Sequence, residues 1–294
     1  MAACRLTLLG NFTLVAGDGR QLPLPTRKDR LLLAYLALSP GRAHPRERLA
    51  GLLWSDRAAG QARDSLKQSL ASIRQTFRQV GLDPLCADRD TAALEADRIE
   101  IDAIEFARFA ASSMQPERAA ALYQGELLEG IDGLGSDLET WLRAERERLT
   151  DLAVRVLEEL AIGADRDGAT EDAVRLGRHL LARDPLREPV YRALMRLMVR
   201  QDERAAALKL YATCRESLKR DLGVAPDIKT EDLYRDILTD RLPQASATSQ
   251  AAPSSDRPSV AVLPFSNLGG DSDLARYCEG ATEDIITGLG RFRM

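Results

Sequence analysis

The stretch that decides the fold runs from Gly60 to Val80 and reads GQARDSLKQSLASIRQTFRQV. Its large apolar residues recur at spacings of four, three and four, so on a helix they form one narrow stripe. The positions between them are polar or small. This pattern predicts an amphipathic helix with a single buried face. The stripe consists of Leu66, Leu70, Ile73 and Phe77.

The polar residues of this predicted helix fall into three groups. Guanidinium and ammonium groups on one flank can bind phosphates or guanine edges, and Gln or Ser side chains can bind base edges. The alternative is the solvated face of an ordinary helical domain. The basic flank holds Arg63, Lys67, Arg74 and Arg78, the side opposite the stripe holds Asp64, Gln68, Ser72, Gln75 and Gln79, and the other flank holds Ser65, Ser69 and Thr76.

The residues before this helix predict a small sheet and two shorter helices. Two β-like runs, Arg5–Leu9 and Phe12–Val15, are separated by a Gly-Asn pair and indicate an antiparallel sheet. An apolar helical pattern then follows the N-cap candidate Thr26 and stops after Leu38 at a Ser-Pro-Gly sequence. A second short helix is predicted from Pro45 to Trp54.

The residues after this helix predict a hairpin between Pro84 and Ile101. Its strands are expected at Ala93–Ala96 and Arg98–Ile101. A β element, three helices and a hairpin follow one another in the order of a winged helix, a helix-turn-helix variant whose third helix enters the DNA major groove. This order favours DNA binding over a merely solvated face.

The texture from about Asp102 to Leu242 is helical throughout. Successive helix pairs repeat about every 34 residues, which is typical of tetratricopeptide-like stacking. The alternative is a plain helical bundle without a ligand. The predicted helices are Ile104–Ser113, Pro116–Tyr123, Leu138–Ile162, Thr170–Arg183, Glu188–Arg200, Glu203–Leu222 and Asp227–Leu238.

The last part of the chain changes composition twice. Residues 243–257 have no aliphatic side chain larger than Ala and predict a flexible linker. Residues 258–294 begin with a run that predicts a buried strand, Pro258–Phe265, and continue with a helical pattern over Ala281–Leu289. About 37 residues are too few to bury an independent core, so a truncated third domain is expected.

The charge is distributed unevenly along the chain. Residues 1–80 contain thirteen Lys and Arg residues against five acidic ones, a net charge of +8. Because the whole chain has a net charge of −4, the remaining residues carry −12. A basic end on an acidic chain predicts a polyanion partner for that end, since the local potential steers association.

Several function classes are disfavoured by composition. Four scattered Cys and two His offer neither a disulfide framework nor a typical zinc site, and little material for a Ser-His-Asp triad. No glycine-rich phosphate loop is visible. No apolar run approaches the roughly 20 residues of a membrane helix. The expectation is a cytoplasmic protein with no membrane contact, no cofactor, no metal and no enzymatic activity.

The chain resembles a known family through several short motifs. The first part matches in four segments, which are Leu6–Phe12, Arg27-Lys28, Arg46–Trp54 and Ala62–Leu70. The second part matches in Ala121–Leu128, Trp141 with Glu145-Arg146, Asp184–Glu188 and Asp221–Pro226. Together these segments resemble the SARP/AfsR-type bacterial regulators, which join an OmpR-like winged helix to a bacterial transcriptional activator domain. Ser259–Phe265 and Gly280–Ile286 are similar to the start of a TolB-like module.

The resemblance implies a mainly α fold. An N-terminal winged helix-turn-helix (α+β), residues 1–101, would precede an all-α tetratricopeptide-like domain, residues 102–242. The linker, 243–257, and the TolB-like segment, 258–294, would follow.

The resemblance also implies a transcription activator that binds promoter repeats on double-stranded DNA as two or more copies. The helical domain would serve self-association or contact with RNA polymerase. The wing supplies only Arg89 and Arg98 as cations and lacks the family's usual Gly-Tyr. Two alternatives stay open, which are a tetratricopeptide-like adaptor without specific DNA binding and an enzyme. The implied DNA contacts are Arg63, Lys67, Gln68, Arg74 and Arg78, with Arg27 and Lys28 on phosphates.

Overall fold

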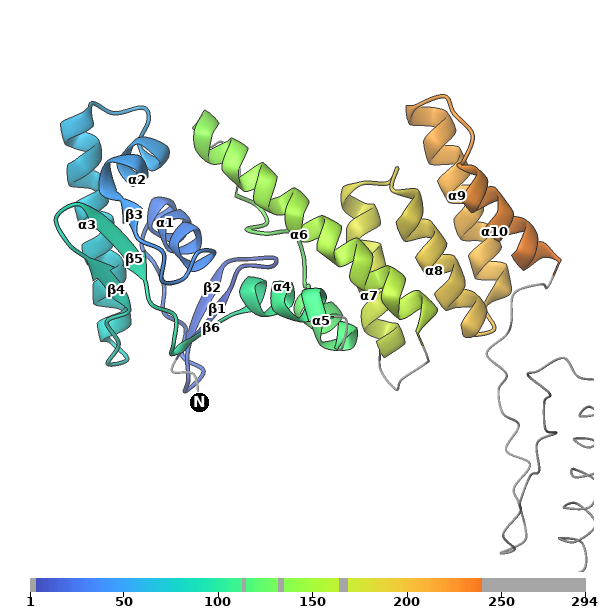
Figure 1. Cartoon of the computed structure of the whole chain (residues 1–294), viewed down its shortest axis with the longest axis horizontal. Helices are drawn as coiled ribbons and strands as arrows, with labels where there is room; N and C mark the ends of the chain where they lie inside the picture. Colours follow the sequence, from blue (N-terminus) through green and yellow to red (C-terminus); the bar gives the residue numbers. More distant parts are fainter. Residues whose placement is uncertain (1–3, 113–114, 132–134, 164–168, 240–294) are drawn as a thin grey trace, which may run out of the picture. The chain divides into compact units, whose positions relative to one another are not determined.

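The computed structural model describes residues 4–112, 115–131, 135–163 and 169–239 (Figure 1). The chain divides into two units, Met1–Ala245 and Ser246–Met294, and every described residue belongs to the first. The predicted linker and the TolB-like segment lie outside the described residues. The bounds of the four predicted segments stay predictions.

The chain begins with a three-stranded sheet. Strands β1 (Cys4–Thr7) and β2 (Thr13–Ala16) pair antiparallel, which confirms the small sheet expected from the alternating pattern. A third strand, β6 (Ile99–Ile101), pairs in parallel with the other edge of β1, so the strand order is β2-β1-β6. This sheet joins segments about 95 residues apart, Arg5 pairing with Glu100.

Three helices follow at the predicted places. They are α1 (Arg27–Ala37), α2 (Arg46–Leu53) and α3 (Ala59–Arg78). Thr26 caps α1 as predicted, because its hydroxyl oxygen accepts a hydrogen bond from the backbone N–H of Asp29 at 3.1 Å. Helix α3 packs on both α1 and α2.

The hairpin lies earlier in the chain than predicted. Strands β4 (Leu85–Ala87) and β5 (Thr91–Leu94) pair antiparallel, and β3 (His44–Pro45) extends the same sheet on the other side of β5. The Asp88 carboxylate accepts backbone hydrogen bonds at the turn, from Asp90 at 2.8 Å and from Thr91 at 2.6 Å. The predicted strand Arg98–Ile101 was therefore assigned to the wrong partner, since its residues join β1 instead.

The second region is a stack of helices, and all seven predicted helices are present within two residues of their predicted bounds. Helices α4, α6, α8 and α10 contact one another in succession, and α5 contacts α7. This layering of helix pairs confirms the tetratricopeptide-like prediction (Figure 1). The helices are α4 (Asp102–Ser112), α5 (Pro116–Leu122), α6 (Ser136–Ile162), α7 (Ala169–Arg183), α8 (Glu188–Arg200), α9 (Arg204–Asp221) and α10 (Ile228–Leu238).

Helix α6 belongs to both regions. Near its start it contacts α2, and the ring of Trp141 lies against Tyr35 of α1 with ring centroids 4.8 Å apart. Towards its end it packs on α7 and α8. One continuous apolar core extends from Leu6 in β1 to Leu197 in α8. The helical array and the N-terminal region are therefore packed as one body.

None of the helices in the described part of the chain combines the length and the apolar composition needed to cross a membrane.

Candidate nucleic-acid interface

Helix α3 is held on one side and exposed on the other. Its apolar stripe is buried as predicted. On the flank of Ser65, Ser69 and Thr76, the hydroxyl of Ser69 donates to the buried carboxylate of Asp29 on α1, and Ser72, predicted on the side opposite the stripe, donates to the same carboxylate at 3.1 Å. This flank therefore packs within the protein, whereas the basic flank and the rest of the side opposite the stripe face solvent.

A groove of about 910 Å³ lies between α3 and the β4–β5 hairpin. We call it the reading groove. Its volume is within the range of ordinary ligand sites, but its lining is strongly charged. Five basic and three acidic side chains line it, namely Arg46, Arg63, Lys67, Arg74, Arg89, Glu47, Asp64 and Asp90.

Three of the predicted contact residues are exposed, and their side chains form no hydrogen bond or ion pair with another described residue. Lys67 and Gln68 lie side by side on α3, and Arg27 begins α1. Within the described ranges, none of these three side chains has a hydrogen bond or an ion pair. Their polar groups are therefore available to a partner without breaking any internal contact.

Three other predicted residues are paired within the protein. Arg63 donates to Glu47 at 2.6 Å. Arg74 donates to Asp83 at 2.9 Å and to the carbonyl of Leu85 at 2.7 Å, and Arg78 donates to Asp83 at 3.3 Å. Partial burial acts to raise the pKa of Asp83, but the hydrogen bonds from these two arginines hold it below its ordinary value. Arg74 and Arg78 thus fasten the start of the hairpin to α3.

Lys28 is also used inside the protein. Its ammonium donates to the carbonyl of Leu53 at the end of α2. Burial lowers the pKa of Lys28 below its ordinary value, and the neighbouring charge of Arg27 acts in the same direction. In this structure Lys28 ties α1 to α2.

Sequence reasoning missed several residues of the reading groove as site residues. Arg46 donates to the carbonyl of Asp88 at 2.9 Å and so attaches the start of α2 to the hairpin turn. Glu47 and Asp64 add acidic groups, and Arg89 stands in the turn itself. A signal was available, because Arg46-Glu47 begins a short helix just before α3.

The N-terminal sheet meets the helical array through a set of backbone hydrogen bonds. The backbone of Leu8–Gly10 is hydrogen-bonded to Glu126–Glu129, with Leu128 donating to Leu8 and Gly10 donating to Glu126, both at 2.8 Å. We call this contact the junction. Asp102, at the start of α4, accepts from the backbone N–H groups of Leu8 at 2.7 Å and Leu9 at 2.9 Å.

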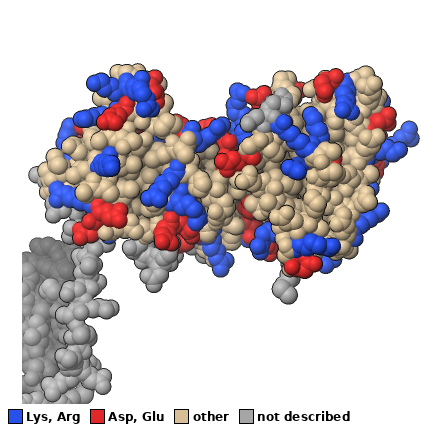
Figure 2. Space-filling view, turned by 180° about the vertical axis from the view of Figure 1, so that it is seen from behind, with Lys and Arg blue, Asp and Glu red and all other residues tan. Residues whose placement is uncertain are grey.

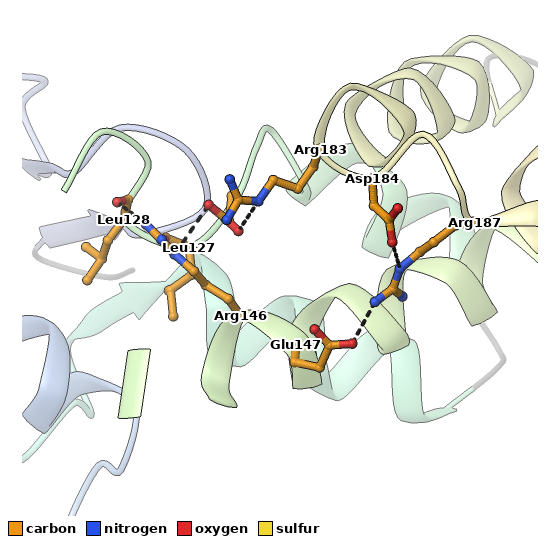
Figure 3. Close-up of polar contacts among 8 residues, drawn as sticks. Leu127, Leu128, Arg146, Glu147, Arg183, Asp184 and Arg187 are labelled. Carbon is orange, nitrogen blue, oxygen red and sulfur yellow. Dashed lines mark hydrogen bonds and ion pairs between the residues drawn. The ribbon is translucent and has the colours of Figure 1, made fainter. Parts of the chain in front are cut away.

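Arg146 of α6 closes the junction (Figure 3). Its guanidinium donates to the carbonyls of Leu127 and Leu128, each at 2.9 Å, and pairs with Glu126 at 3.4 Å. Arg183 of α7 reaches the same carboxylate at 2.9 Å. Gly125 is also packed tightly against Glu129 here, because a Cβ on Gly125 would lie 2.6 Å from a Glu129 side-chain oxygen.

Basic and acidic groups are interspersed over the face of the molecule shown in Figure 2. The excess positive charge of residues 1–80 is therefore not matched by a uniform basic surface on that face. Within the described part of the chain, no three His, Cys, Asp or Glu side chains are grouped so that they could hold a metal ion.

The model of the bacterial transcriptional activator domain family matches residues 90–238, about half of the chain. This chain belongs to that family. The match begins after α3, so the bacterial transcriptional activator domain itself contains the hairpin's last strand and the helical array.

Several regulators resemble this family member over most of its length. The regulatory protein AfsR of Streptomyces coelicolor is 27% identical over 279 residues, which cover 88% of this chain and 27% of AfsR. The transcriptional regulatory protein MoaR1 of Mycobacterium tuberculosis is 27% identical over 237 residues, 75% of each chain. The regulatory protein DnrI of Streptomyces peucetius is 25% identical over 246 residues, 75% of this chain and 87% of DnrI. These relatives confirm the resemblance to SARP/AfsR-type regulators, although the chain spans only about a quarter of the length of AfsR.

A solved structure has the same fold. Mycobacterium tuberculosis EmbR, in complex with a low affinity phosphopeptide, superposes with a TM-score of 0.60 at 19% identity, covering all of this chain and 73% of EmbR. The winged helix followed by a tetratricopeptide-like array is therefore an architecture that this member shares with EmbR.

Proposed function

We propose that this chain is a sequence-specific DNA-binding activator of transcription that reads its promoter with α3 and the reading groove. One observation carries the proposal, which is that the side chains of Lys67 and Gln68 are exposed on α3 and have no hydrogen-bond or ion-pair partner among the residues that the structure describes. An exposed cation that no internal carboxylate neutralises is suited to a phosphate, and an adjacent free amide is suited to an adenine edge. The regulatory names of the relatives support the same function.

In this proposal the contacts to DNA come from α3 and from the elements on either side of it. Helix α3 enters the major groove with Gln68 and Arg63 towards base edges and Lys67 towards a phosphate. Arg89 of the hairpin turn and Arg27 of α1 contact the backbone at either side. Arg74 and Arg78 hold the hairpin in place, so their contribution to binding is largely through its position.

The helical array would serve self-association on promoter repeats or contact with RNA polymerase in the cytoplasm. The surface at the far end of this array is evidence for a protein partner, because three large apolar side chains near the turn between α9 and α10 are exposed. They are Leu222, Val224 and Ile228.

Selection of bound duplexes from a random DNA pool by the whole chain tests the proposal. The winning duplex is then titrated at two salt concentrations beside a scrambled duplex of the same composition. We expect a repeated motif and an affinity for it at least a thousandfold above that for scrambled DNA, the low end for specific binders (about 10³). Salt-sensitive binding without a motif would contradict the proposal and favour an adaptor with an incidental basic surface.

A further inference from the structure

A carboxylate stands among the basic groups of the reading groove. Glu47, in the first turn of α2, accepts from the Nη2 group of Arg63 at 2.6 Å, and the two side chains are 78% and 61% exposed. Within the described residues, the second carboxylate oxygen of Glu47 has no hydrogen bond, and neither do Nε and Nη1 of Arg63. The pair therefore offers one free carboxylate acceptor and the remaining N–H donors of Arg63 to the groove.

Stability does not account for this pair. An ion pair between two exposed side chains contributes about 0 to 1 kcal/mol and is screened by salt. A carboxylate in a groove that receives a polyanion also repels every phosphate that enters. The charge of Glu47 therefore opposes the phosphates of any duplex, and such a repulsive element favours a partner only by rejecting others more strongly.

We infer that Glu47 is a specificity-determining residue, which holds Arg63 so that its guanidinium meets a guanine and not a phosphate. A guanidinium has five N–H donors in a planar fork, and fixing Nη2 leaves other donors for the O6 and N7 acceptors of guanine. The free oxygen of Glu47 is then suited to the amino group of a cytosine. Glu47 and Arg63 together select a G·C pair. This inference rests on the proposed function, because it concerns the base preference of the same groove.

The inference is tested by repeating the duplex selection with the whole chain carrying Glu47→Gln. We expect tighter binding to scrambled DNA and a loss of about tenfold in the preference for G·C at one position of the motif, within the range for one bidentate contact. The melting temperature should stay unchanged, since the pair is exposed. Glu100→Gln is the matched control, because Glu100 pairs with Arg5 at 3.1 Å in the first sheet and does not line the groove.

A double-variant cycle separates this role from a general charge effect. In a chain that carries Arg63→Ala, adding Glu47→Gln should change the base preference much less than it does in the wild-type chain, while still strengthening binding to scrambled DNA. A motif that keeps its G·C preference in the Glu47→Gln chain would overturn the inference alone, as would an equal loss of preference in the Glu100→Gln chain. A wild-type chain that selects no motif would overturn the proposed function and this inference with it.

Discussion

The junction and the reading groove use the same kind of side chain in opposite ways. In the junction, Arg146 is 14% exposed, and its Nε and Nη2 groups contact two carbonyls and the Glu126 carboxylate (Figure 3). On the exposed side of α3, the side chain of Lys67 has no hydrogen-bond or ion-pair partner in the described part of the chain. A buried cation that loses its acceptors leaves polar groups without partners, whereas an exposed cation exchanges its contacts with water at little cost. A cation with internal acceptors within reach therefore stabilises the fold, whereas one without them is available to a binding partner.

Of the changes that test this comparison, removing Arg146 should lower the free energy of unfolding the most. Arg146→Ala removes charge-assisted hydrogen bonds to the carbonyls of Leu127 and Leu128 and leaves Glu126 paired with Arg183 alone, so we expect the free energy of unfolding to fall by about 4 kcal/mol. Chemical denaturation measures this change. Arg143→Ala on the same helix is the control, because Arg143 is 77% exposed and meets Glu139 only at 3.7 Å. Equal losses of unfolding free energy in the two variants would show that burial of the cation does not determine its contribution to stability.

Raising the pH should have the second largest effect, because it removes a stabilising contribution of Asp102 at the junction. Burial raises the pKa of Asp102 to about 6 from 3.8, although backbone N–H donors of Leu9 and Leu8 act to lower it. The folded chain then binds this proton more tightly than the unfolded chain does. The stabilising effect is thus complete below about pH 4 and is lost as the pH rises through about 6, an effect on the order of 3 kcal/mol.

Unfolding free energies of the wild-type and Asp102→Asn chains between pH 4 and pH 7 measure this contribution. The difference between the two chains should change over that range, since the amide does not titrate. A constant difference would show that Asp102 keeps one protonation state throughout.

Arg74 sharpens the comparison because it lies between the two extremes. It lines the reading groove, yet it is only 28% exposed and donates to Asp83 and to the carbonyl of Leu85. Arg74→Ala should lower the free energy of unfolding by about 1 kcal/mol. It should also weaken DNA binding, because the hairpin loses its attachment. Weaker binding together with unchanged stability would instead place Arg74 directly on the DNA.

Much of the fold could be predicted because its signals are local. Helix α3 was predicted from the spacing of its four apolar residues, and α1 from the cap at Thr26 and the Ser-Pro-Gly stop. The array helices are bounded by Gly, Asp and Pro residues next to them in sequence. These features depend on neighbours within one or two turns, so the chain itself records them.

The pairings across the fold could not be predicted in this way. A three-residue strand such as β6 has an alternation that fits any edge, and its partner β1 lies about 95 residues away. Similarly, the helical wheel places Arg63 and Arg74 on the basic flank, but it cannot show that Glu47 and Asp83 are within reach. The contact residues on α3 therefore remain predictions, and the structure distinguishes them by their internal partners.

The salt dependence of duplex binding by a Lys67→Ala chain tests the central claim most directly. Because Lys67 is exposed and has no internal partner among the described residues, its removal should change the free energy of unfolding by less than about 0.5 kcal/mol. Affinity for the selected duplex should fall, and the slope of log affinity against log salt should decrease in magnitude by about one, as expected for one lost phosphate contact. A variant with wild-type affinity and slope would contradict the assignment of α3 as the helix that meets DNA.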